Sequence, residues 1–363
     1  MAFSSQDEKF MRRALALARR GVGKTSPNPA VGAVLVRNGR VIGEGWHRKA
    51  GGPHAEVVAL RGVNARGATL YVTLEPCSTW GRTPPCTEAV IQAGVKRVVV
   101  AARDPNPKHQ GRGLTLLKRA GIRVESGLLA QEAARLNEAF NKWITTGLPF
   151  VIAKAAMSAD GKIATRAGDS KWITSEKARR EAHALRAGVD AIMVGANTVI
   201  RDNPRLTVRH GFSGRQPWRV AMDSRGHCPL TAHLFTDRFR RKTIVVTSRH
   251  SPKRWRDALA KRRICVLQAP SRNLRAALKA LGRLNVTSVL IEGGGDLLGA
   301  AFDAGLVNKA VFFYAPVVIG GSRAVTAVKG TGAARVKHAV RLRNCQWRSL
   351  GHGEILLEAT VER

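Results

Sequence analysis

The sequence predicts an α/β protein built from two domains. Its 363 residues are enough for two domains of the usual size, roughly 100–200 residues each. Apolar runs of strand length alternate with segments of helical periodicity in both halves, which predicts sheets covered by helices on both faces. The stretch 145–149 (TTGLP) is typical of a linker. We therefore expect one domain at residues 1–147 and a second at 148–363.

The first half opens with a helix and a hairpin. The stretch 5–8 (SQDE) matches a capping box and predicts a helix that runs to about Arg20. Asn38-Gly39 lies between two apolar runs and is a strong signal for a two-residue β-hairpin. Beyond the hairpin, helices are expected near 54–60, 87–93, 114–120 and 131–143, and strands at 69–74, 96–102 and 122–125.

The second half starts with a new strand at 150–157, directly after the linker. The alternation of strands and helices then resumes, which predicts a second α/β domain. Further strands are expected at 191–195, 219–222, 243–247, 288–291 and 310–315, with helices at 175–186 and 274–281 among those between them.

The bulk composition is that of a globular protein, with 44% hydrophobic residues. No apolar run approaches the roughly 18 residues of a membrane span, and the polar start lacks the apolar core of a signal peptide. The five cysteines are few, odd in number and scattered, so we expect no disulfide framework. A reducing cytoplasm is therefore the expected location, with no membrane partner.

The charge is unusual, because 61 Lys and Arg residues against 25 Asp and Glu give a net +36. A nucleic-acid site would gather these cations on one face and add aromatic side chains for stacking. Aromatic residues make up only 5% of the chain, and the basic residues occur throughout both halves. We favour a solvated basic surface that helps to attract phosphorylated ligands, and we do not expect a nucleic-acid partner.

Four residues of the first half form a metal-site pattern. His54 stands two residues before Glu56, and Cys77 and Cys86 each follow a proline. Three nitrogen and sulfur ligands leave a tetrahedral Zn²⁺ with one open position, as in catalytic sites. His-x-Glu followed by Pro-Cys and a further Cys is the signature of zinc nucleobase deaminases, where the glutamate is general acid and base. We predict zinc at His54, Cys77 and Cys86, with Glu56 as the catalytic carboxylate.

A non-catalytic zinc module is the alternative, and it would need a fourth protein ligand. His47 and His109 stay open as candidates for that ligand.

The spacing of the two cysteines distinguishes between families of zinc deaminases. Nucleic-acid deaminases have Pro-Cys-x-x-Cys, whereas eight residues separate Cys77 from Cys86. This long loop resembles the deaminase domain of the bifunctional riboflavin-biosynthesis deaminase–reductases. The resemblance extends to 27–32 (PNPAVG), 45–47 (GWH), 81–86 (GRTPPC) and 104–107 (DPNP).

This resemblance implies a cytidine-deaminase-like α/β/α sandwich and a phosphorylated substrate. The substrate would be a diamino-pyrimidinone that carries a ribosylamino 5-phosphate and loses its 2-amino group as ammonia. Glu56 would take the proton of the attacking water and return it to the ring nitrogen and the leaving amine. Asn28 and Asp104 precede prolines and would equally serve to set turns. Family positions for substrate contacts fall on Asn28, His47, Arg82, Asp104 and Asn106.

The second half contains a strand that runs into three glycines and a helix, at 286–297. Such a turn suits a dinucleotide phosphate, but by itself a plain strand-to-helix turn is an equal interpretation, and the spacing is not G-x-G-x-x-G. The neighbouring segments resemble the reductase domain of the same family, which is similar in fold to dihydrofolate reductase and uses NADPH. They are 158–162 (SADGK), 168–175 (GDSKWITS), 197–204 (NTVIRDNP), 206–209 (LTVR) and 223–224 (DS).

The reductase resemblance implies two sets of contacts and the transfer of a hydride from NADPH to C1 of the ring-opened ribose. Lys154 and Asp160 fall near the ligands without a defined role, and Lys154 is counted with the substrate contacts. The implied cofactor contacts are Ala156, Trp172, Thr198, Asp202, Ser224, Gly294, Gly295, Asp296, Leu297, Leu298, Gly299 and Ala300. The implied substrate contacts are Ser170, Arg186, Leu206, Arg209 and Glu292.

The sequence thus predicts a bifunctional enzyme with two successive activities, a zinc-dependent pyrimidine deaminase at 1–147 and an NADPH-dependent reductase at 148–363. One Zn²⁺ per deaminase domain and NADPH are the expected cofactors. The resemblance also implies a homo-oligomer, a dimer or a tetramer. The alternative is a tRNA or DNA base deaminase with an accessory domain, which only the basic charge supports.

Overall fold

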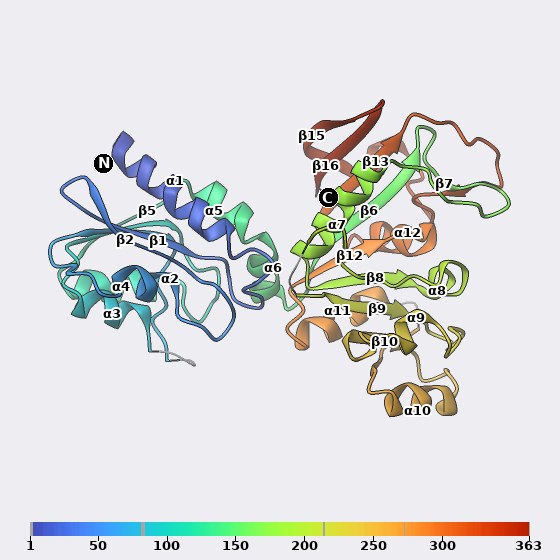
Figure 1. The fold of residues 1–363 in the computed structure, drawn as a ribbon, viewed down its shortest axis with the longest axis horizontal. Helices are drawn as coiled ribbons and strands as arrows, with labels where there is room; N and C mark the ends of the chain where they lie inside the picture. Colours follow the sequence, from blue (N-terminus) through green and yellow to red (C-terminus); the bar gives the residue numbers. More distant parts are fainter. Residues whose placement is uncertain (1–2, 81–83, 213–214, 272, 363) are drawn as a thin grey trace. The chain divides into compact units, whose positions relative to one another are not determined.

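A computed structural model describes residues 3–80, 84–212, 215–271 and 273–362. The chain folds as two compact units, Met1–Gly147 and Leu148–Arg363, called unit 1 and unit 2 below. Both are mixed α/β structures, as the alternating pattern predicts (Figure 1). Among the described residues no helix is long and apolar enough to cross a membrane.

Unit 1 is a five-stranded sheet with helices on both faces. The strand order is β2-β1-β3-β4-β5, in which β1, β2 and β3 are antiparallel neighbours and β3, β4 and β5 run parallel. Asn38 and Gly39 have φ of 51° and 73°, as the tight turn between β1 and β2 requires. The strands are β1 (Gly32–Arg37), β2 (Arg40–Trp46), β3 (Thr69–Leu74), β4 (Arg97–Ala102) and β5 (Arg123–Ser126).

Helices α1 and α5 cover one face of this sheet, and α2, α3 and α4 cover the other. The first face is packed with side chains such as Met11, Tyr71 and Val99, and the second with Leu70 and Leu117. The helices are α1 (Ser5–Arg19), α2 (Ala55–Leu60), α3 (Cys86–Gln92), α4 (Arg112–Arg119), α5 (Ala130–Leu136) and α6 (Glu138–Thr146).

Two details of unit 1 differ from the sequence prediction. The capping box of α1 is formed by Ser4 and Asp7, one residue earlier than predicted, because the carboxylate of Asp7 reaches back to the Ser4 amide at 3.0 Å. The helix predicted at 131–143 is two helices that meet at Asn137. The buried Asn137 amide accepts from Ala30 N at 2.8 Å and donates to Ala30 O at 3.0 Å, a pairing between residues distant in sequence.

Asp7 is also the centre of a buried polar network. Its carboxylate accepts from Tyr71 Oη at 2.7 Å and from Arg97 Nη1 at 2.6 Å. The hydrogen bond from Arg97, in spite of burial, holds the pKa of Asp7 well below its usual range. Because the folded pKa is depressed, this network stabilises the protein above the unfolded pKa near 4, and the stabilisation is lost as the pH falls toward the folded value.

Replacing Asp7 with asparagine is expected to lower the free energy of unfolding of unit 1 by about 2–3 kcal/mol at pH 7, since among the described residues Arg97 then keeps Glu125 alone as an anionic partner. The difference from wild type should shrink below pH 4. Hydrogen exchange of the α1 amides in the full chain, measured at both pH values, tests this. Glu8→Gln is the control, because its ion pair with Arg12 is exposed and should contribute less than about 1 kcal/mol. Equal losses of unfolding free energy in Asp7→Asn and Glu8→Gln would contradict the stabilising role of the Asp7 network.

Unit 2 is a nine-stranded sheet of order β11-β10-β9-β8-β12-β6-β13-β16-β15. The strands from β11 to β13 are parallel, and β16 and β15 extend the sheet as an antiparallel hairpin. This hairpin was not among the predicted elements. The strands are β6 (Phe150–Ser158), β8 (Ala191–Gly195), β9 (Trp218–Met222), β10 (Thr243–Thr247), β11 (Cys265–Gln268), β12 (Ser288–Glu292), β13 (Lys309–Ala315), β15 (Arg341–Gly351) and β16 (Glu354–Glu362), with β7 (Lys162–Ala164) and β14 (Val325–Thr326) as a separate pair.

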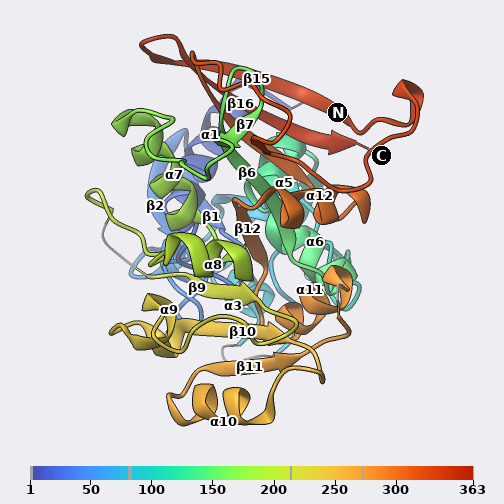
Figure 2. The same ribbon diagram turned by 90° about the vertical axis from the view of Figure 1, so that its right-hand side faces the viewer.

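The helices of unit 2 lie on both faces of its sheet (Figure 2). Residues of α7, α8 and α10 pack on one face, and residues of α11 and α12 pack on the other. They are α7 (Glu176–Gly188), α8 (Ala196–Asp202), α9 (His233–Thr236), α10 (Lys253–Lys261), α11 (Leu274–Arg283) and α12 (Gly295–Asp303).

The order of the strands places a topological switch point at the carboxyl ends of β8 and β12. These strands are neighbours, but α8 leaves β8 toward one face and α12 leaves β12 toward the other. In open parallel sheets, ligands bind where consecutive connections diverge in this way. The topology therefore places the candidate cofactor segments 196–202 and 293–300 at the expected edge of the sheet.

Candidate active sites

The metal-site pattern of unit 1 forms one compact group. His54 immediately precedes α2, Cys77 follows β3, and Cys86 begins α3. Their ligand atoms all lie within 4.8 Å of one another. His54 Nδ1 is 3.1 Å from Cys86 Sγ and 3.5 Å from Cys77 Sγ, and a tetrahedral zinc with one nitrogen and two sulfur ligands has edges of roughly 3.5 Å. The three side chains therefore fit a zinc ion.

The surroundings of Cys77 favour its thiolate form. The Cys86 amide, at the start of α3, donates to Cys77 Sγ at 3.2 Å. A hydrogen bond from the Cys86 side chain, assisted by His54, holds the pKa of Cys77 well below its usual range. A thiolate is the form that binds a metal, so Cys77 is prepared for this role.

Glu56 lies beside the metal group, in the first turn of α2, and only 3% of it is exposed. Burial, reinforced by the charge of Cys77, raises the pKa of Glu56 to about 7. A carboxyl group with a pKa near neutrality can both accept a proton and return it, which suits a general acid and base.

His47 and His109 are not part of the metal group. The buried imidazole of His47 contacts Pro53 O through Nδ1 at 3.0 Å and the Asn28 amide through Nε2 at 3.1 Å. Burial lowers the pKa of His47, so the ring is neutral at pH 7. Asn28 and His47, two predicted substrate contacts, are thus brought together next to His54, whose ring centre is 5.3 Å from that of His47.

The other predicted contacts of unit 1 lie in the loop after β4. Asp104 Oδ1 accepts from Asn106 N at 2.9 Å, and Asn106 Oδ1 accepts from Lys108 N at 3.1 Å, so both side chains help to set the turn. The buried Glu75 holds this loop in place. Its carboxylate accepts from Asp104 N, Gly111 N and Gly113 N at 3.0–3.2 Å. The predicted contact Arg82 lies outside the described residues.

Six of the predicted site residues of unit 2 line a cavity of about 460 Å³ beside α7. Ala156, Ser170 and Trp172 line it, together with the basic side chains of Lys154, Arg186 and Arg209. Its further lining residues are Ile163, Ile173, Thr174, Arg179, Ala182, His183 and His210.

The cationic groups of the cavity differ in what they bind. Arg186 is fully engaged by the protein, since it donates to both carboxylate oxygens of Glu292, at 2.8 and 2.5 Å, and to Thr207 O at 3.0 Å. Partial burial lowers the pKa of Lys154, although Glu292 nearby opposes the shift. Burial together with Arg186 and Arg205 lowers the pKa of Arg209. The cavity therefore has an excess of positive charge.

Leu206 and Asp160 have structural contacts. The Leu206 side chain is buried in a core cluster, and its backbone φ is 47°. Asp160 accepts from Ser158 Oγ at 2.6 Å and from the amides of Ile319 and Gly320 at 3.0 and 2.9 Å, which fixes that loop.

The glycine-rich turn after β12 lies next to α8. Gly293 and Gly294 have φ of 72° and 80°, and a Cβ at Gly294 would come within 3.3 Å of Thr198 Oγ1. Among the described residues no atom lies within 4 Å of a Cβ built at Gly293. The open backbone at Gly293, two residues before α12, therefore fits the phosphates of a dinucleotide.

The other predicted cofactor contacts differ in their surroundings. Asp202 ends α8, and Ser224 follows β9, where its carbonyl accepts from Ser248 Oγ at 2.7 Å. Gly299 has a packing role, because a Cβ there would lie 2.2 Å from Lys329 O.

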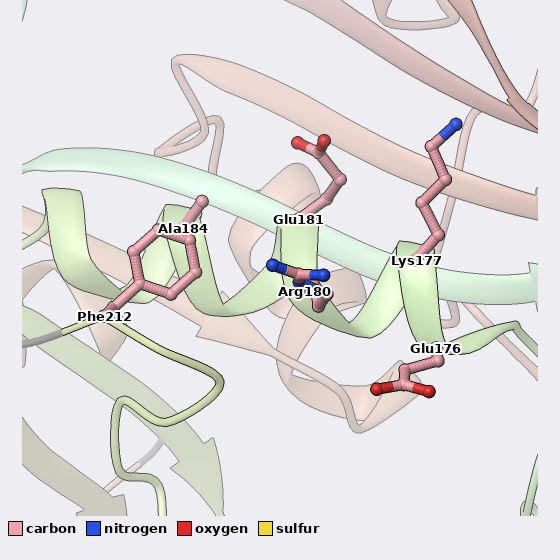
Figure 3. Close-up of a pocket in the computed structure, with 6 residues that line it drawn as sticks. All are labelled: Glu176, Lys177, Arg180, Glu181, Ala184 and Phe212. Carbon is pink, nitrogen blue, oxygen red and sulfur yellow. The ribbon is translucent and has the colours of Figure 1, made fainter.

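A second depression, on the outer side of α7, is lined by Glu176, Lys177, Arg180, Glu181, Ala184 and Phe212. None of these is a predicted site residue. Figure 3 shows the charged side chains pointing in different directions from the helix, without a common focus. We therefore assign no site to it.

Comparison with known proteins identifies the family. The model of the RibD C-terminal domain matches residues 149–356, and that of the cytidine and deoxycytidylate deaminase zinc-binding region matches residues 4–102. The riboflavin biosynthesis protein RibD of Aquifex aeolicus is 42% identical over 352 residues, which cover 96% of this chain and 97% of the relative. The chain belongs to the RibD family.

Solved structures of RibD proteins resemble the whole chain. One from Acinetobacter baumannii is 39% identical with a TM-score of 0.90, covering 98% of this chain and 99% of its own. A diaminohydroxyphosphoribosylaminopyrimidine deaminase/5-amino-6-(5-phosphoribosylamino)uracil reductase from Thermotoga maritima is 35% identical with a TM-score of 0.85, with coverage of 98% and 99%.

The predicted fold class and family are thereby confirmed. Like other RibD proteins, the chain is a bifunctional deaminase and reductase of riboflavin biosynthesis, with zinc and NADPH as cofactors.

Sequence reasoning missed several residues that the structure brings to the two sites. Arg179, Ala182, His183 and Arg186 follow the i, i+3, i+4, i+7 spacing of one helix face, and all four line the cavity of unit 2. Since Arg186 was already a candidate, this periodicity was the signal for Arg179 and His183. Glu75 gave no comparable signal, because its partners are backbone amides.

Proposed function

We propose that unit 1 deaminates 2,5-diamino-6-(5-phosphoribosylamino)pyrimidin-4(3H)-one, and that unit 2 reduces the ribosyl side chain of the product with NADPH to give 5-amino-6-(5-phosphoribitylamino)uracil. The observation that carries this proposal is the grouping of His54, Cys77 and Cys86 around a buried Glu56, in the same chain as a cationic cavity beside a glycine-rich turn. The Thermotoga maritima relative is named for both reactions.

In unit 1, His54, Cys77 and Cys86 would hold the zinc, which supplies the acidity that makes water a nucleophile near neutral pH. Glu56 takes the proton from the water and delivers it to the ring nitrogen and then to the departing amine, so that ammonia leaves. The hydrogen bond from the Asn28 amide to His47 fixes the orientation of Asn28 and leaves its carbonyl oxygen as an acceptor for the pyrimidine.

In unit 2, the turn at 293–300 and Thr198 would hold NADPH, which supplies the hydride. The side chain of Arg209 is exposed at the cavity and binds the phosphate of the substrate. Glu292 and Arg186 fix the backbone of Thr207 and so place Arg209.

We also propose a cytoplasmic location, which the five free cysteines support. The dimer or tetramer implied by the family resemblance stays a prediction.

Incubation of the full chain with the diamino-pyrimidinone phosphate, with and without NADPH, tests the proposed function. We expect a mass change from loss of the amino group without NADPH, and a further gain of two hydrogens when NADPH is present. Treatment with a zinc chelator should abolish the first change and spare reduction of added deaminated pyrimidine. Reduction without prior deamination, or no turnover of either compound, would refute the proposal.

A further inference from the structure

His183 occupies an unexplained position in the cavity of unit 2. It lies in the middle of α7, on the same face as Arg186, and lines the cavity although only 5% of the residue is exposed. None of the contacts implied by the family resemblance includes it. Each nitrogen of a buried imidazole needs a hydrogen-bond partner, which can be a protein atom, a water or, at a cavity, a bound ligand.

One nitrogen has a structural partner. The backbone amide of Arg209 donates to His183 Nδ1 at 3.0 Å. An acceptor nitrogen carries no proton, so the neutral ring must carry its proton on Nε2. This form suits the surroundings, because burial together with Arg186, His210 and Arg209 lowers the pKa of His183 to about 4.

The other nitrogen is free to bind a ligand. In the described part of the chain Nε2 has no hydrogen-bond partner, and it is not among the polar atoms sealed from solvent without one. The position of the ring is fixed from two sides, by the Arg209 amide and by the His210 ring, whose centre is 4.7 Å away. His183 therefore presents one N–H donor of fixed direction at the cavity.

The charge of the cavity indicates what this donor binds. Lys154, Arg179 and Arg209 line it, no carboxylate is among its described lining residues, and Glu292 is already paired with Arg186. An anion is the ligand that these groups favour, and a phosphate has oxygen acceptors for a guanidinium and a neutral N–H together. We propose that Nε2–H of His183 donates a hydrogen bond to the phosphate of the reductase substrate, beside Arg209. This inference rests on the proposed function of unit 2.

The replacement of His183 by asparagine tests the contact. The amide oxygen of asparagine takes roughly the place of Nδ1 and can still accept from Arg209 N, but nothing replaces Nε2–H. Because a hydrogen bond to a charged group contributes about 1.5–3 kcal/mol, the KM for the deaminated phosphorylated substrate should rise roughly tenfold to a hundredfold. The KM for NADPH and the deaminase activity of the same chain should not change. Arg180→Asn, on the outer face of α7, is the matched control and should leave all three values unchanged.

The substrate itself provides the decisive comparison. With the dephosphorylated form of the pyrimidine, His183→Asn should have little effect on KM, since the contact that it removes is absent in wild type as well. An equal rise for both substrates, or no rise for either, would overturn the proposal. Failure of wild type to oxidise NADPH would instead refute the proposed function.

A second measurement covers the case in which the variant loses its fold, which a change in the KM for NADPH would reveal. In the ¹⁵N-histidine-labelled wild-type chain, with His183→Gln to assign the signal, the Nε2 resonance of His183 should shift on addition of the phosphorylated pyrimidine but not of its dephosphorylated form. The absence of this difference would also overturn the proposal.

Discussion

Replacing Glu56 with glutamine should reduce the release of ammonia by about 10²–10⁴-fold while zinc remains bound, because a side-chain amide cannot take the proton of the attacking water. Zinc content should stay at one per chain, since the proposed ligands His54, Cys77 and Cys86 are untouched. Reduction of supplied deaminated pyrimidine should also be unchanged. The measurements are ammonia release, metal analysis and NADPH oxidation on one preparation.

Glu88 offers a matched control for this experiment. It stands two residues after Cys86 in the first turn of α3, as Glu56 stands two residues after His54 in the first turn of α2, but Glu88 is exposed. Glu88→Gln should therefore release ammonia at the wild-type rate. Similar rates for the two variants would contradict the role of Glu56.

Replacing Glu292 with glutamine should lower the free energy of unfolding of unit 2 by about 3–5 kcal/mol, because it removes a buried carboxylate and leaves two partly buried cations, Arg186 and Lys154, without it. Although burial opposes the shift, Arg186 and Lys154 lower the pKa of Glu292. The folded pKa is depressed, so this stabilisation is present above the unfolded pKa of about 4 and disappears as the pH falls through the folded value. The difference in the free energy of unfolding between wild type and Glu292→Gln should therefore shrink as the pH falls below about 4.

Urea unfolding of the full chain measures this loss of unfolding free energy, and two further variants test its cause. Glu181→Gln breaks an exposed pair with Arg348 and should cost less than about 1 kcal/mol. Adding Lys154→Met to Glu292→Gln should restore part of the stability, since one uncompensated charge is removed. A double variant no more stable than the single one would show that the charge of Lys154 is not the cause.

The sequence predicted features that depend on neighbouring residues. Asn38-Gly39 specified the β1–β2 hairpin because this turn needs positive φ at both positions. Short spacings along the chain also identified the metal group, since His54, Cys77 and Cys86 lie at the ends of elements that meet at one edge of the sheet.

Features that depend on residues far apart in the sequence were not predicted. The break between α5 and α6 follows from the pairing of Asn137 with Ala30, 107 residues away in sequence. The ion pair of Arg186 with Glu292 joins residues that are 106 positions apart in the sequence. The pairing could therefore not be predicted from the sequence around either residue. β15 is exposed along almost its whole length, and it therefore lacks the alternation by which half-buried strands are recognised.

The pairing of Asn137 with Ala30 also limits where the gene can be shortened. The zinc-binding region matched by the deaminase model ends at residue 102, yet the loop that presents Asn28 is held by an amide of residue 137. A protein that stops after the metal-binding segment, or even after α4, would keep every proposed zinc ligand and lose this anchor. The smallest independent deaminase that can be cut from this chain therefore has to extend through the α5–α6 junction.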